Sequence, residues 1–299
     1  MNLFQKYKLR YSFIVLVLFL LVGCKSEPCK TCVQTKVFLT YNDGRGRNLL
    51  AQELSGASLF IYNDMGNLVK SVNLSQQDIL NPMGVDVELP LDDEYTLVCW
   101  GNIGRNSVLE SKDDLQKAKL KSARSASNST MLATTDPLYF GIEKYYFASK
   151  YNNSSRIVMV DLVPKHISFE VTIQGFEASV PQLTVEHALS QYNFYGKAVS
   201  DKYSTVQPKI DFVSSIQGVQ STFNVLRPQS LENMYVLLSS AEMIEPKRID
   251  VQKIVREHYP NLDLTKDKIK IEILIKYSNL SVEITIPDWS TNDTNVGVV

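Results

Sequence analysis

The sequence predicts an all-β protein built as two β-sandwich domains in series, with one or two short helices. Segments in which apolar and polar residues alternate recur along the chain, and this period of two is typical of half-buried strands. Clusters of Asn, Asp and Gly separate these segments at turn positions. Helical periodicity is scarce, and a chain of 299 residues is long for one hydrophobic core but sufficient for two.

The first residues have the pattern of a bacterial lipoprotein leader that ends before Cys24. A basic segment precedes an apolar run over residues 13–22, which is shorter than the ~20 residues that a membrane-spanning helix needs. We therefore expect residues 1–23 to be a signal peptide. The four residues that end at Cys24, Leu-Val-Gly-Cys, have the form of a lipobox, so Cys24 is the expected site of acylation, and acyl chains would hold the protein to a membrane. The alternatives are an ordinary secretory leader or an uncleaved anchor.

A polar, lipidated tether is expected over residues 24–34. Within it, Cys29 and Cys32 have CxxC spacing, which in an exported protein predicts either a local disulfide or two free thiols. A zinc site needs about four ligands, and the three histidines lie far away in the sequence. Cys99 lies on the apolar side of an alternating segment and is expected to be a buried small hydrophobe.

The first domain is expected over residues 35–155. Its first strand covers residues 37–41, in which Val37, Leu39 and Tyr41 share one face because side chains alternate along a strand. The later elements follow from turn and capping signals. These are a hairpin of strands 58–62 and 68–74 with a five-residue loop, a strand over 95–100, and a short helix over 112–120 capped by Ser111.

The second domain is expected over residues 156–299, with a strand over 167–173 and a helix over 251–259 capped by Asp250. Its clearest feature is a hairpin of two alternating segments, residues 269–277 and 280–286. A two-residue turn at Ser278 and Asn279 would pair Tyr277 with Leu280 and place both apolar sets on one face.

Composition and motifs argue against an enzyme, a cofactor site and a nucleic-acid partner. The 31 Lys and Arg are balanced by 32 Asp and Glu, so the net charge of −1 creates no field that attracts nucleic acid. The sequence has no GxSxG, HExxH, P-loop or GxGxxG motif and no cluster of metal ligands at suitable spacing. Trp100 and Trp289 lie at strand ends, where large rings usually pack, and the alternative for either is a sugar-stacking role.

The order of these segments resembles the FimB-like anchor and minor subunits of Bacteroidales fimbriae, also called type V pili. The resemblance covers nearly the whole chain after Cys24 and rests on the order of the segments rather than on one motif. The chain departs from the family pattern at Asp93, where glycine is usual, and at residues 164–166. Besides the lipobox, the matching segments are Leu59–Val69, Leu89–Asn102, Leu138–Gly141, Ile157–Ile173 and the terminal hairpin that ends at Trp289.

This resemblance implies two transthyretin-like sandwiches in a surface-exposed lipoprotein of the outer membrane that anchors or terminates a fimbrium. In such fimbriae, a sandwich that lacks one strand accepts a strand from its neighbour. An anchor keeps its first strand, here Val37, Leu39 and Tyr41, and the lipid on Cys24. The implied partners are the fimbrial shaft subunit and the outer membrane, and no enzyme activity is expected. The alternative from another class is a surface glycan-binding β-sandwich lipoprotein.

Two further segments bear on strand exchange. Arg45 and Arg47 follow the first strand, where a cut after arginine would release that strand as in a shaft subunit; we favour a solvated hairpin tip instead. Val296 and Val298 have the period-two spacing that an inserted strand needs. We expect the segment that contains them to be either the strand donated to the shaft or a frayed terminus.

Overall fold

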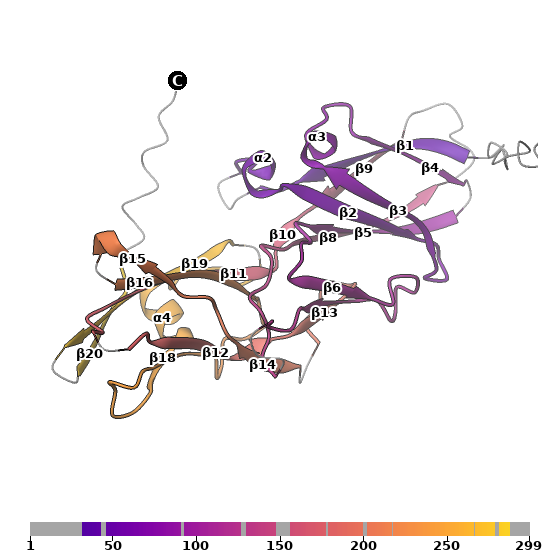
Figure 1. Cartoon of the computed structure of the whole chain (residues 1–299). Helices are drawn as coiled ribbons and strands as arrows, with labels where there is room; N and C mark the ends of the chain where they lie inside the picture. Colours follow the sequence, from indigo (N-terminus) through magenta and orange to yellow (C-terminus); the bar gives the residue numbers. More distant parts are fainter. Residues whose placement is uncertain are drawn as a thin grey trace, which may run out of the picture.

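Strands dominate the protein, as the sequence predicts, and they form two β-sandwiches joined end to end (Figure 1). The structure is a computed structural model. It describes residues 32–42, 46–90, 93–126, 130–147, 156–177, 179–199, 202–216, 218–265, 267–278 and 281–287.

The first sandwich consists of a three-stranded sheet that covers one face of a five-stranded sheet. Side chains from both sheets form a single apolar core between them. The smaller sheet has the order β4 (Val85–Pro90), β1 (Cys32–Thr40), β9 (Arg156–Asp161). The larger has the order β10 (Val163–Pro164), β8 (Tyr139–Phe147), β5 (Asp93–Gly101), β2 (Gly56–Tyr62), β3 (Leu68–Ser75).

The second sandwich is one nine-stranded sheet that bends into two layers (Figure 1). The bend lies between β12 and β16, which share a single residue pair, Leu189 with Leu226. One layer contains β18 (Lys247–Asp250), β17 (Tyr235–Ser239), β12 (Gln182–Leu189) and β14 (Tyr203–Val206). The other contains β15 (Asp211–Val213), β16 (Gly218–Leu226), β11 (His166–Gln174), β19 (Ile269–Ser278) and β20 (Ser281–Thr285).

Helices are few and short among the described residues. The helix predicted after Asp250 is confirmed as α4 (Val251–His258), and the Asp250 carboxylate accepts a hydrogen bond from the Lys253 backbone N–H at 3.0 Å. The helix predicted over residues 112–120 is wrong, because this segment forms turns that lead into a strand. The remaining helical segments are the single turns α2 (Leu50–Glu53), α3 (Gln76–Ile79) and η2 (Ser214–Ile216).

The structure corrects two boundaries and one strand register. Strand β1 begins at Cys32, so the last three residues of the expected tether, 32–34, already belong to the sheet. Strand β9 pairs with β1, and the first sandwich therefore extends past the expected boundary at residue 155. In the terminal hairpin Tyr277 pairs with Val282 instead of Leu280. This two-residue shift keeps every side chain on its predicted face, because the period of a strand is two.

An apolar core and a small sheet join the two sandwiches. The small sheet has the order β13 (Gln191–Asn193), β7 (Lys119–Ser122), β6 (Ser107–Glu110), so it pairs a strand of the second sandwich with a hairpin of the first half of the chain. Beneath it, Trp100 lies 4.7 Å from Phe140 and 6.2 Å from Phe194 between ring centroids. All three side chains are buried. The five-stranded sheet of the first sandwich is thus covered on both faces.

Buried polar groups lie beside this core at the passage from β10 to β11. Lys165 donates its backbone N–H to the Leu138 carbonyl at 2.8 Å, and the His166 ring nitrogen Nδ1 lies 3.0 Å from the same oxygen. The Arg227 guanidinium donates to the carbonyls of Leu264 and His166. Burial lowers the pKa of His166 to about 4 and, together with the nearby Arg227 charge, lowers the pKa of Lys165 to about 8.

We predict that Phe194→Ala destabilises the whole protein by about 3–5 kcal/mol, the usual cost of emptying a buried phenylalanine site. The ring contacts Phe60, Tyr62 and Trp100 across the domain junction, so both sandwiches lose packing. Urea unfolding monitored by circular dichroism measures the change. Phe212→Ala is the matched control, since that ring is 74% exposed and its loss should change stability by no more than ~0.5 kcal/mol. A similar stability for both variants would contradict the interdomain core.

We also predict that the protein loses stability as the pH falls from 6.5 to 4. The folded state keeps His166 neutral down to about pH 4, whereas an unfolded histidine binds a proton near pH 6.5. The unfolded state therefore binds more protons in this window, and the loss contributed by His166 reaches roughly 3 kcal/mol at pH 4.

Urea unfolding at pH 7.5, 5.5 and 4.5 tests this pH dependence. His166→Gln should remove the part of the pH dependence of stability that is due to His166. His258→Gln, at an exposed position, should leave the pH dependence as it is in the unmodified protein. The same acid sensitivity in both variants would show that His166 is not its source.

Candidate functional site

The candidate functional site consists of strand β1, the two strands that flank it and the apolar core beneath it. Strand β1 is the central strand of its sheet. It pairs antiparallel with β4 from Cys32 opposite Pro90 to Val37 opposite Val85. On its other edge it pairs in parallel with β9, from Thr35 to Thr40. Both backbone edges of β1 are therefore paired within its own sandwich, and neither is open to a strand from another chain.

The inward side chains of this strand are part of the core. Val37 is completely buried, and Leu39 and Tyr41 are 5% and 2% exposed. They pack against the five-stranded sheet in the same core as Leu59 and Leu97. Without β1, strands β4 and β9 would face each other across roughly 9–10 Å, which is two strand spacings, and the core side chains below would be open to solvent.

The outward side chains connect β1 to both neighbours. The Lys36 ammonium lies 2.8 Å from the Asp86 carboxylate of β4, and the Thr40 hydroxyl donates a hydrogen bond to Asp161 of β9. An exposed ion pair contributes only about 0–1 kcal/mol. The strand is therefore held chiefly by its backbone ladders and its buried side chains.

The end of this strand is linked to the second sandwich through Tyr41. Its ring meets Tyr139 edge to face at 5.0 Å, and the Tyr139 hydroxyl donates to the Glu53 carboxylate at 2.7 Å. The same carboxylate accepts hydrogen bonds from Lys268 at 2.7 and 2.9 Å. Burial alone would raise the pKa of Glu53, but the hydrogen bonds from Lys268 and Tyr139 outweigh it and hold this pKa below its usual value.

The segment after β1 contains the two arginines that the sequence singled out. Arg47 is exposed in the loop that leads to α2, and Asn42 and Asn48 form a bridge across the base of this loop. Arg45 lies outside the described residues. A cut after Arg47 would separate β1 from the rest of the sandwich, so its position fits either a protease site or a hairpin tip.

Of the other residues predicted to matter, Cys24, Trp289, Val296 and Val298 lie outside the described residues. Cys29 also lies outside the described residues; Cys32 is disulfide-bonded, so it is not a free thiol. Cys99 and Trp100 are buried as expected, and burial raises the pKa of the Cys99 thiol to about 12.

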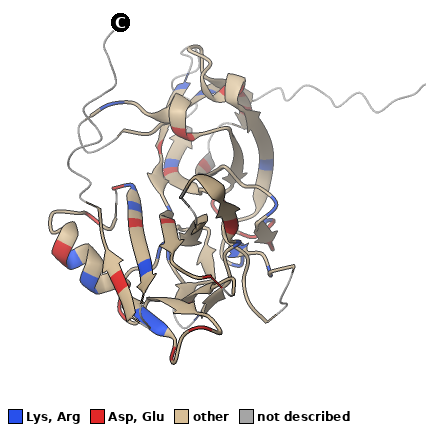
Figure 2. Ribbon diagram, turned by 60° about the vertical axis from the view of Figure 1, so that its left-hand side comes forward, with Lys and Arg blue, Asp and Glu red and all other residues tan. Residues whose placement is uncertain are grey.

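The described part of the chain shows neither a metal centre nor a single-sign field. No group of three or more His, Cys, Asp or Glu is placed to hold a metal ion among the residues that the structure covers. In this same part, no helix has the length and apolar character to cross a membrane. Basic and acidic residues are interspersed over both sandwiches (Figure 2). Such a mixed surface does not create the strong single-sign field that steers a highly charged ligand.

The sequence alone did not predict the strands that flank β1 or the polar residues near its end. The alternation in Val85-Asp86-Val87-Glu88-Leu89 was a signal for β4. No local signal identifies β9 as the parallel partner of β1, or Glu53 and Lys268 as partners, because these residues are distant in sequence and meet only in the folded protein.

Solved structures of several bacterial proteins share this fold. A candidate polysaccharide-binding protein of Bacteroides thetaiotaomicron VPI-5482 aligns with a TM-score of 0.69 and 13% identity, over 86% of this chain and 96% of that one. A candidate adhesin of the same organism aligns with a TM-score of 0.64 and 13% identity, over 89% and 98%. The fimbrial anchor protein Mfa2 of Porphyromonas gingivalis aligns with a TM-score of 0.62 and 12% identity, over 86% and 98%.

One curated protein with a similar sequence belongs to a different class of protein, and this chain covers only a small part of it. A probable cytoplasmic valine–tRNA ligase of Vairimorpha ceranae (strain BRL01) is 23% identical over 229 residues, which are 74% of this chain and 23% of the ligase. The chain thus spans less than a quarter of that relative's length, and at this identity the match does not carry the ligase activity over.

The family comparison is more extensive. Residues 26–295 match the family model of the fimbrillin-A associated anchor proteins Mfa1 and Mfa2. This range includes both sandwiches and the junction between them. The chain therefore belongs to the family of fimbrillin-A associated anchor proteins.

Proposed function

We propose that this protein is a non-enzymatic accessory subunit of a fimbrium at the cell surface. In this proposal it is an outer-membrane lipoprotein that anchors or terminates the fimbrium. Acyl chains on Cys24 hold it to the membrane, and strand donation joins it to the shaft subunit. Membership of the anchor family supports the fimbrial role. The observation that carries the anchoring role is that β1 lies in its own sheet, paired along both edges.

A complete first sandwich restricts how the protein can join a chain of subunits. Strand exchange needs an open position in a sheet, with unpaired backbone groups at its edges and an apolar groove that receives side chains. Here β1 fills that position with its backbone and with Val37, Leu39 and Tyr41. In the described first sandwich this position is filled, so in the proposal the subunit joins the shaft by donating a strand, which makes it a terminus. Val296 and Val298 are the proposed donor residues.

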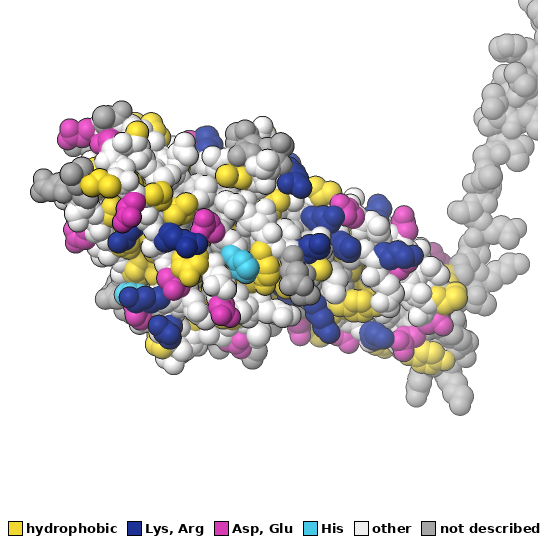
Figure 3. Space-filling view, turned by 90° about the horizontal axis from the view of Figure 1, so that it is seen from below, with side chains coloured by type: hydrophobic (Ala, Val, Ile, Leu, Met, Phe, Trp, Pro, Cys, Tyr) yellow, Lys and Arg dark blue, Asp and Glu magenta, His cyan; other side chains and the backbone are white. Residues whose placement is uncertain are grey.

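The glycan-binding alternative is less well supported. The description of the B. thetaiotaomicron neighbour as a candidate polysaccharide-binding protein concerns that protein. In this chain Trp100 lies in the interdomain core with no exposed ring surface, so it cannot stack on a sugar. On the face shown in Figure 3, apolar side chains lie in small groups between charged ones rather than as a broad platform.

We predict that Cys24→Ala releases the protein from the membrane fraction without unfolding it, because the described fold begins at Cys32. Alkaline carbonate extraction followed by immunoblotting measures the release. In the unmodified protein, mass spectrometry should find an N-terminal peptide that starts at acylated Cys24. A variant that stays fully membrane-bound would overturn the lipid assignment. An N-terminus at Asn48 would instead place the chain among shaft or tip subunits cut after arginine.

We predict that deletion of residues 292–299 detaches fimbriae into the medium while the truncated lipoprotein remains on the cell. No described core residue is lost, so its melting temperature should not change. Val296→Asp with Val298→Asp should act like the deletion, because an inserted strand places alternate side chains in apolar pockets. Asn292→Asp with Thr294→Asp is the matched control with the same added charge. Normal anchoring by the deletion would shift the donor role to the strand over residues 280–286.

A further inference from the structure

The end of strand β1 is held by contacts that do not depend on the loop that follows it. The Leu49 backbone N–H, on the far side of this loop, donates to the Tyr41 carbonyl at 2.9 Å. Asn42 and Asn48 form a bridge across the base of the loop. A break in the chain after Arg47 would remove none of these contacts.

Helix α2, which follows the loop, is fixed to the body of the protein in two ways. Leu50 and Leu54 are buried in the core that also contains Tyr41. The Glu53 backbone carbonyl accepts a hydrogen bond from the Asn102 side chain at 2.7 Å. The helix lies on the side of the first sandwich that faces the second (Figure 1). It therefore stays beside the end of β1 without help from the loop.

The Glu53 side chain connects this helix to both sandwiches. Its carboxylate accepts hydrogen bonds from the Tyr139 hydroxyl at 2.7 Å and from the Lys268 ammonium at 2.7 and 2.9 Å. Tyr139 is completely buried, and its ring packs against Tyr41. Because the Glu53 side chain is only 19% exposed, these charge-assisted hydrogen bonds are largely shielded from water, which strengthens them. The second sandwich thus supports, through Lys268, the side chains that lie against the end of β1.

These contacts matter most when the loop is broken. A short covalent connection keeps a strand at a millimolar effective concentration beside its position in the sheet. A cut removes this contribution, and the strand then stays only if its noncovalent contacts suffice. For β1 these are the ladders on both edges, the buried side chains of Val37 and Leu39, and the contacts at Tyr41.

We propose that the Glu53–Lys268 pair, together with Tyr139, forms a latch that retains β1 in the first sandwich. The latch holds the strand even when the chain is cut after Arg47, which is exposed. A cut subunit would then remain a two-piece assembly whose strand position is still filled. This inference rests on the proposed anchoring role and deepens it, because it assigns the residues that keep the first strand in place.

A cut at a chosen position tests the latch without fimbriae. The recognition sequence of a sequence-specific protease is inserted between Arg47 and Asn48 in the Cys24→Ala variant, since exposed loops tolerate insertions. After complete cleavage, the fragment that ends at the cut should remain bound during gel filtration at micromolar concentration. Its release is timed by exchange against an excess of fluorophore-labelled peptide with the sequence of residues 32–47. Separation of the fragment from this protein on the column would overturn the proposal.

Lys268→Met should release the fragment at least tenfold faster, because Glu53 then loses its charged partner. Lys268→Arg should restore slow release, since it keeps the charge and the hydrogen-bond donors. The matched control is Lys270→Met. The Lys270 side chain is 37% exposed against 40% for Lys268, and it pairs with Glu170 at 2.9 Å within the second sandwich. Equal release rates for Lys268→Met and Lys270→Met would show that the latch does not hold the strand.

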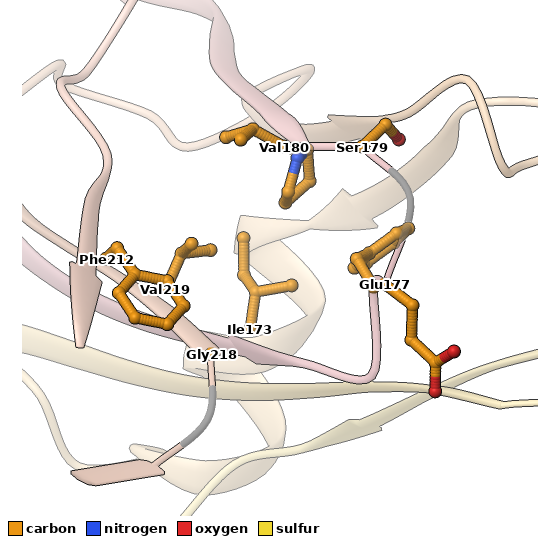
Figure 4. Close-up of a pocket in the computed structure, with 9 residues that line it drawn as sticks. Ile173, Glu177, Ser179, Val180, Phe212, Gly218 and Val219 are labelled. Atoms are coloured by element: carbon orange, nitrogen blue, oxygen red, sulfur yellow. The ribbon is translucent and has the colours of Figure 1, made fainter. Parts of the chain in front are cut away.

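Two further variants separate the latch from general stability. Val219→Ala removes packing at an apolar pocket of about 220 Å³, which opens beside Ile173 near the end of β11 (Figure 4). No residue of β1 or of the latch lines this pocket, so release should not become faster, and release as fast as in Lys268→Met would overturn the proposal. Tyr139→Phe removes only the hydroxyl that donates to Glu53. It should act like Lys268→Met, and it replaces that variant if Lys268→Met does not fold.

The latch and the proposed anchoring role can fail separately. If the cut protein releases β1 but Cys24→Ala still frees the uncut protein from the membrane, the latch fails and the lipid anchor stands. If the strand is retained but the 292–299 deletion still anchors fimbriae, the latch stands and the donor role of the last residues fails.

Discussion

The placement of the first strand in each sandwich is the constraint on which the rest of the structure depends. In the first sandwich, β1 lies between an antiparallel partner, β4, and a parallel partner, β9. In the second, β11 lies in the same way between antiparallel β16 and parallel β19. Each domain thus brings its first strand against its last long strand, and each core is complete only when that strand is in place. The two halves of the chain thus place their first strand in the same way, although their sheets differ.

Much of the fold could be predicted because strand periodicity is local. The hairpin of β2 and β3 and the faces of β19 and β20 follow from alternation alone, and the register shift at Tyr277 left those faces unchanged. What alternation does not encode is the neighbour of a strand. The pairing of β1 with β9 joins residues more than a hundred positions apart. Single-turn helices such as α2 and α3 are too short to show any helical period.

The interdomain core could likewise be predicted only in part from the sequence. The predicted burial of Trp100 is confirmed, and the apolar run Leu97-Val98-Cys99-Trp100 is what a strand covered on both faces should look like. The run does not indicate which residues pack on the second face of the strand. That cover includes Phe194 and Tyr192, which belong to a short strand and a turn without periodic signal. For the candidate site, the residues of β1 were identified from the sequence, whereas Glu53, Tyr139 and Lys268 emerged only from the folded arrangement.

The direction of β1 determines how the protein responds to mechanical force. A pull applied through the residues before Cys32 acts along the axis of the strand, since the strand begins at that residue. Both hydrogen-bonded ladders of β1 are then sheared at once, over six residue pairs on each side, and do not open one bond at a time as a peeled hairpin does. The Glu53–Lys268 pair and the aromatic junction pass tension from the end of this strand into the second sandwich. The two domains would therefore resist extension as one unit.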